Sequence, residues 1–84
     1  MMTNEQNARL NAARAESGDL FNVGDTLGLH RLAAGLYRDA AGALVARQTK
    51  YRNALIAEAE LVSDSAEFLE AEWRKTNGEA VAYG

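Results

Sequence analysis

Apolar and polar residues recur along most of this chain with the period of an α-helix. No window alternates with the two-residue period of a strand, and the β-branched residues are scattered. Proline is absent, and the helix-favouring residues alanine, leucine, glutamate and arginine are frequent. The pattern predicts an all-α fold in a single small domain over residues 1–84.

The first predicted helix covers residues 3–17. Thr3 and Gln6 have the spacing of a capping box, in which each side chain satisfies a free backbone N–H at the helix start. Gly18 suits the left-handed position that ends many helices, so we expect a loop over residues 18–25. Leu10 is the one large apolar residue of this helix, and the helix is expected either to dock as an arm or to fray.

A long helical pattern follows over residues 26–62, with Asp25 or Thr26 as its N-cap. At about 100° per residue its apolar positions fall on one stripe, which Arg47 and Glu58 share. A break near Gly42 would give a helical hairpin instead of one rod, and the pattern leaves both open. The stripe consists of Leu29, Leu32, Leu36, Ala40, Ala43, Leu44, Tyr51, Ala54, Leu55, Leu61 and Val62.

Two interpretations remain for the C-terminal part. In the first, residues 63–65 interrupt the helix, Asp64 and Glu67 form a second capping box, and a helix covers residues 64–76 before an extended tail over 77–84. In the second, a heptad seam continues through the serines and joins this helix to the one before it. The seam residues are Leu55, Ala59, Val62, Ala66, Leu69 and Trp73.

Composition limits how far this domain can stabilise itself. Apolar residues make up 48% of the 84 residues, but 17 of them are alanine. A chain of this length buries only about 60% of its unfolded surface. The core is therefore thin, and a partner subunit would supply the missing stability.

Several classes of protein are excluded or disfavoured. Without cysteine there is no disulfide scaffold, no thiolate nucleophile and no cysteine-ligated metal. Residues 1–5 lack the plan of a signal peptide, and no run approaches the roughly 20 apolar residues that span a bilayer. The net charge of −3 is spread along the chain, which disfavours a general nucleic-acid binder. We expect a cytoplasmic protein, free or within a particle, with no membrane partner.

Few residues suggest catalysis or a cofactor. The single histidine, His30, cannot form a zinc site, and it fits a surface or half-buried helix position. Asp64, Glu67 and Glu70 either hold a divalent cation or stabilise the positive end of a helix dipole. No glycine-rich phosphate loop is present. We expect no enzyme activity, no metal and no cofactor.

Gly28, Gly35 and Gly42 recur every seven residues inside predicted helix, and we call them the glycine strip. Each costs about 1 kcal/mol relative to alanine in a helix interior. A strip without side chains lets another backbone approach closely. Arg31 and Arg38 border it and suit carboxylates or phosphates.

Three interpretations of the glycine strip remain. The first helix lies across it, with Ala8, Ala12 and Ala15 against the glycines. Alternatively a second chain or a target helix docks there, with an anion bound by the two arginines as a minor variant. In the third, the glycines mark helix breaks or recur by chance.

Apolar residues at two further places either fill the core or anchor a partner. Leu20 and Phe21 cluster with Val23 in the predicted loop, and Trp73 lies near Phe68 and Leu69 on one side of the last predicted helix. Tryptophan is enriched among the residues that anchor protein interfaces.

These features predict a non-enzymatic helical interaction or assembly protein. It would act as an oligomer, or as a small structural or accessory component of a larger assembly such as a phage-type particle. The alternative is a small helical inhibitor or sequestering protein that binds a macromolecular target or an anionic ligand. The hypothetical interface residues are Gly28, Gly35, Gly42, Arg31, Arg38, Leu20, Phe21 and Trp73.

Overall fold

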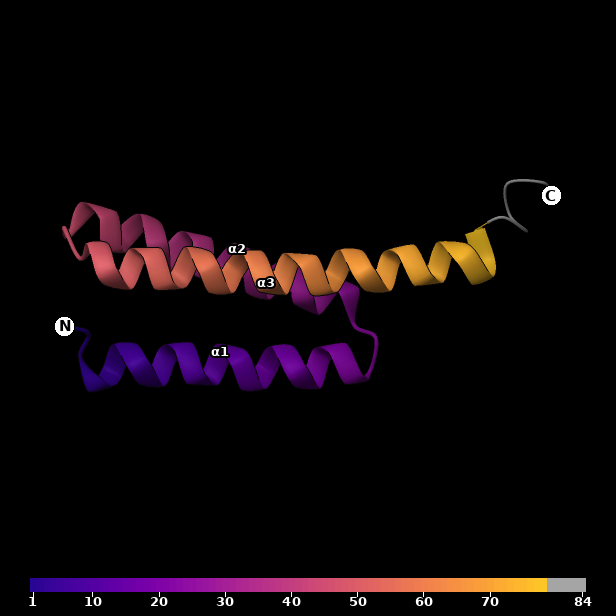
Figure 1. Ribbon diagram of the computed structural model, residues 1–84, viewed down its shortest axis with the longest axis horizontal. Coiled ribbons are helices and arrows are strands. Elements are labelled where there is room, and N and C mark those ends of the chain that lie inside the picture. Colours follow the sequence, from indigo (N-terminus) through magenta and orange to yellow (C-terminus); the bar gives the residue numbers. More distant parts are fainter. Residues whose placement is uncertain (79–84) are drawn as a thin grey trace.

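The computed structural model describes residues 1–78, which form helices joined by two short turns (Figure 1). Helix α1 covers Asn4–Asn22, α2 covers Thr26–Val45, and α3 covers Thr49–Trp73. A π-helical turn, η1 (Arg74–Gly78), extends α3. Helices α1 and α3 run in the same direction and α2 runs against both, in a molecule 53 Å long. The predicted all-α fold is confirmed.

Helix α1 begins as the sequence predicts but continues past Gly18. Its capping box is formed, since the N–H of Gln6 donates to Oγ1 of Thr3 (3.1 Å) and the N–H of Thr3 donates to Oε1 of Gln6 (2.9 Å). Beyond Gly18, the half-buried Leu20 packs against the core. Burial of a leucine contributes more than the penalty of about 1 kcal/mol for one helical glycine, so the helix continues.

The residue that ends α1 is Gly24, which has a left-handed φ of 72°. Its N–H donates to the carbonyl of Phe21 (3.1 Å), and the N–H of Asp25 donates to the carbonyl of Leu20 (2.9 Å). This pair of bonds is the Schellman motif that terminates many helices. The predicted loop over residues 18–25 is therefore wrong. The turn covers residues 23–25, and Leu20 and Phe21 lie on α1.

Asp25 caps α2, because its carboxylate accepts from the N–H of Gly28 (2.8 Å). The segment over residues 26–62 is two helices, and the turn lies at residues 46–48, whereas Gly42 is inside α2. The N–H of Gln48 donates to the carbonyl of Ala43 (2.8 Å), and the N–H of Arg47 donates to that of Leu44 (3.0 Å). This is the same terminating motif, with Arg47 at a φ of 60° where glycine is usual.

Helix α3 runs through residues 63–65 without a break, as the heptad interpretation requires. Ala59, Val62 and Ala66 are buried on either side of the serines. The hydroxyl of Ser65 donates to the carbonyl of Leu61 (3.0 Å), a bond that a serine can make inside a helix. The predicted helix start at Asp64 is therefore wrong. The predicted tail is helical at residues 77–78, and its remainder, residues 79–84, lies outside the described residues.

The core is a layer between α2 and α3. Its largest fully buried side chains are Leu29, Leu36, Leu55 and Val62, and most of the other buried residues are alanines. Leu44 and Leu61 belong to the predicted stripe, yet they are 57% and 60% exposed. The turn at residues 46–48 reverses the chain, so a single helical wheel over residues 26–62 does not apply. The other stripe residues are buried or half-buried except Arg47, which lies exposed in the turn.

Helix α1 docks on the α2–α3 pair. Leu10 and Ala13 are buried against it, and two ion pairs flank them. The Nε atom of Arg9 lies 2.9 Å from Oδ2 of Asp39 on α2, and the Nε atom of Arg14 lies 3.2 Å from Oε2 of the buried Glu58 on α3. The first helix is therefore a docked arm, held by burial and by one arginine for each neighbouring helix.

The left-handed Arg47 generates a stability prediction. A residue with a Cβ atom is strained by about 1–2 kcal/mol in this conformation, and glycine is not. We expect Arg47→Gly to raise the free energy of unfolding by about 1 kcal/mol, measured by urea denaturation. Ala46→Gly is the matched control, because Ala46 has a negative φ and gains no relief from glycine. Equal or lower stability of Arg47→Gly would contradict the strain argument.

Candidate interaction surface

The glycine strip faces α1 at one end and open space at the other. A Cβ atom on Gly28 would lie 2.6 Å from Oδ2 of Asp25 and 2.7 Å from Cδ2 of Leu20. At Gly35 the nearest atom is Nη2 of Arg9, at 4.0 Å, and at Gly42 nothing lies within 4 Å. Of the three glycines only Gly28 is therefore closely packed, and its neighbours are side chains of the same chain.

The alanines of α1 do not meet the glycines. Ala8, Ala12 and Ala15 are all exposed, because α1 turns Leu10 and Ala13 toward the core instead. The expectation of alanine-on-glycine packing is wrong, although α1 does lie beside the strip through Leu20 and Arg9. Arg31 and Arg38 are exposed on α2.

The three apolar candidates differ in burial. Leu20 is half-buried against the core. Phe21 is 37% exposed, and its ring is tilted by 34° against that of Phe68, with 6.0 Å between centroids. Trp73 is 58% exposed near the end of α3. Leu20 thus belongs to the fold, whereas Phe21 and Trp73 present apolar surface to solvent.

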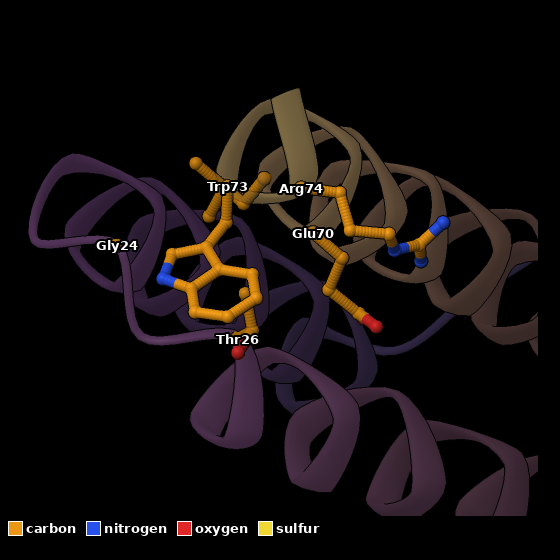
Figure 2. A pocket seen from close by; sticks show the side chains of 6 residues that line it. Gly24, Thr26, Glu70, Trp73 and Arg74 are labelled. Atoms are coloured by element: carbon orange, nitrogen blue, oxygen red, sulfur yellow. The ribbon is translucent and has the colours of Figure 1, made fainter. Parts of the chain in front are cut away.

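Trp73 forms one wall of a hollow of about 600 Å³ between the α1–α2 turn and the end of α3. Figure 2 shows its indole ring over Thr26, while the side chains of Glu70 and Arg74 extend away from the ring. The hollow is also lined by Gly24 and Leu69. Its apolar wall and charged rim suit an apolar side chain better than a reaction, since the polar groups do not converge on one point.

The titratable residues do not gather into a metal site in the part of the chain that the structure describes. His30 is half-exposed and its Nε2 atom pairs with Oε1 of Glu70. Asp64 and Glu67 lie in the middle of α3, so they do not stabilise a helix start. Over residues 1–78 no three potential metal ligands come together. Burial raises the pKa of Tyr51, and the nearby Asp39 carboxylate adds to this effect while Arg9 opposes it.

One surface was missed at the sequence level: the outward face of α2. Six of its residues, at alternating spacings of three and four, form a heptad seam that is exposed along its whole length. The spacing is visible in the sequence, but the predicted core stripe includes Leu44. We call this surface the outer seam of α2, and its residues are Leu27, His30, Ala34, Tyr37, Ala41 and Leu44.

Comparison with protein-family models, with curated proteins and with solved structures gives no match to this chain. No helix within residues 1–78 combines the length and the hydropathy needed to cross a bilayer.

The two ends of the glycine strip lead to opposite predictions. Gly42→Ala adds a methyl group in open space and improves helix propensity, so we expect the free energy of unfolding to rise by about 1 kcal/mol. Gly28→Ala should lower it, because the methyl group displaces Leu20 and the capping carboxylate of Asp25. Thermal denaturation of both variants checks this pair. A rise for Gly28→Ala similar to that for Gly42→Ala would show that α1 does not pack closely there.

Proposed function

We propose that this chain is a non-enzymatic helical interaction protein that works as an oligomer, free or as a small structural or accessory component of a larger assembly. The proposal rests on one observation: the described residues expose more bulky apolar side chains than they bury. The buried ones number six, namely Leu10, Leu29, Leu32, Leu36, Leu55 and Val62. The exposed ones number ten, namely Met1, Phe21, Val23, Leu27, Tyr37, Leu44, Val45, Leu61, Phe68 and Trp73.

The grouping of these side chains supports the proposal more than their number does. Single exposed apolar residues are normal on soluble proteins, whereas grouped ones mark interaction surfaces. Leu27, Tyr37 and Leu44 share one face of α2. Phe21 and Phe68 touch near the end of α1. Such surfaces favour association through apolar contact.

The low stability expected of a single chain also supports the proposal. A domain of this size with an alanine-rich core is expected to be marginally stable. Association stabilises the folded state by mass action, because only the folded chain presents the apolar surfaces in register. Binding and stability are then two consequences of the same contacts.

The proposal predicts that stability and mass depend on protein concentration. We expect the Tm to rise as the protein is concentrated, and light scattering to give a discrete multiple of the chain mass of 9.1 kDa. Calorimetry at several concentrations, with light scattering on the same samples, measures both quantities. Leu10→Ala, which removes a buried side chain, is the control for stability: it should lower the Tm at every concentration without removing the concentration dependence.

A single chain of 9.1 kDa at all concentrations, with a constant Tm, would overturn the proposal. Trp73 provides an independent readout because it is the only tryptophan and is 58% exposed. A blue shift of its emission on association would place the end of α3 in the interface. An unshifted emission in an oligomer would place the interface elsewhere on the chain.

A further inference from the structure

The outer seam of α2 is open to a partner. Its six positions lie about 120° around the helix from the buried residues of α2, and the glycine strip lies about as far around on the other side. Helix α1 covers the glycine side, because Leu20 packs beside Gly28 and Arg9 forms an ion pair with Asp39. The three large apolar residues of the seam are therefore accessible: Leu27 is 58% exposed, Tyr37 44% and Leu44 57%.

The order of large and small residues in this seam is self-complementary. Read along α2 it is Leu27, His30, Ala34, Tyr37, Ala41, Leu44. When the seam meets a second copy of itself in the antiparallel direction, Ala34 lies opposite Tyr37 and Ala41 lies opposite His30. Leu27 lies opposite Leu44, so each contact that one copy makes is repeated by the other. A two-fold symmetric interface requires this reciprocity, and knobs-into-holes packing favours large residues facing small ones. A parallel pair would place Tyr37 against Tyr37.

The helix dipoles favour the same direction. In the antiparallel pair the positive end of each α2 lies beside the negative end of the other. A parallel pair would instead align like ends.

We infer that the outer seam of α2 is the interface of an antiparallel homodimer, with Tyr37 as its central anchor. Tyrosine suits this role because it buries a large ring and keeps its hydroxyl at the wet edge of the interface. The inference deepens the proposed function and rests on it, since it names the partner as a second copy and the surface as α2.

A charge placed in the seam tests the inference. Ala34→Glu adds an exposed carboxylate that can pair with Arg38 one turn away, so the monomer stays folded. In the dimer the same carboxylate faces Tyr37 of the second copy and loses its water. We expect dimer affinity to fall by about a hundredfold or more, measured by analytical ultracentrifugation. Ala12→Glu, on the exposed face of α1, is the matched control and should leave affinity unchanged.

A size exchange tests the register. Tyr37→Ala leaves alanine facing alanine and should weaken the dimer, and Ala34→Tyr puts tyrosine against tyrosine and should do the same. The double variant Ala34→Tyr with Tyr37→Ala again places large against small, so we expect it to recover affinity. No recovery in a folded double variant would overturn the antiparallel register.

A distance measurement tests the direction of the helices. The chain has no cysteine, so a spin label on Val45→Cys, an 84%-exposed site beside the seam, is unique. The antiparallel register separates the two labels by about 28 Å along the helices, whereas a parallel pair brings them within about 10 Å. A short distance would contradict the inference.

Failure of this inference differs from failure of the proposed function. If the wild type is an oligomer that Ala34→Glu leaves intact, the seam is not the interface and the proposed function stands. If Gly42→Leu dissociates that oligomer, the glycine strip is the interface and the inference is again overturned. If the wild type is a monomer at every concentration, both are wrong.

Discussion

The structure depends on close approach between α2 and α3, which alanine makes possible. Ala33, Ala40 and Ala43 on α2 are buried together with Ala59 and Ala66 on α3. Small side chains let helix axes come near each other, so that a few leucines fill the remaining space. The consequence is a core with little hydrocarbon, since each alanine buries much less apolar surface than a leucine. The bulky residues that do not fit such a thin layer lie on the surface.

Helix α1 adds to this pair without thickening the core much. It contributes Leu10, Ala13 and part of Leu20, and its position is fixed by Arg9 on one neighbour and Arg14 on the other. The pair between Arg14 and Glu58 is unequal, because the carboxylate is buried while the arginine is largely exposed. The arginine therefore brings a charge to a carboxylate that would otherwise be desolvated without a partner.

The sequence predicts those elements whose signals are local or periodic. The capping box at Thr3 and the seam from Leu55 to Ala66 are of this kind. It fails where a tertiary contact outweighs a local signal, as at Gly18, where the burial of Leu20 prolongs α1. It also fails at residues 46–48, because Arg47 takes the left-handed conformation without a glycine to indicate it. The candidate surfaces follow the same rule. Phe21 and Trp73 are exposed, as the interface hypothesis requires. Leu44 is exposed although the sequence places it in the core stripe, because the stripe assumes one continuous helix and the turn at residues 46–48 divides that helix in two.

The three sides of α2 differ in what they carry. One side carries leucine and alanine and meets α3, and a second carries the glycine strip beside α1. The third carries the exposed Leu27, Tyr37 and Leu44, with His30, Ala34 and Ala41 between them, and His30 pairs with Glu70 of α3. A purely solvent-facing side of a helix has no need of a tyrosine and two leucines, since charged residues there would add solubility and helix propensity. In the proposed antiparallel pair, Tyr37 of one copy would face Ala34 of the other, and a large side chain against a small one packs well between helices.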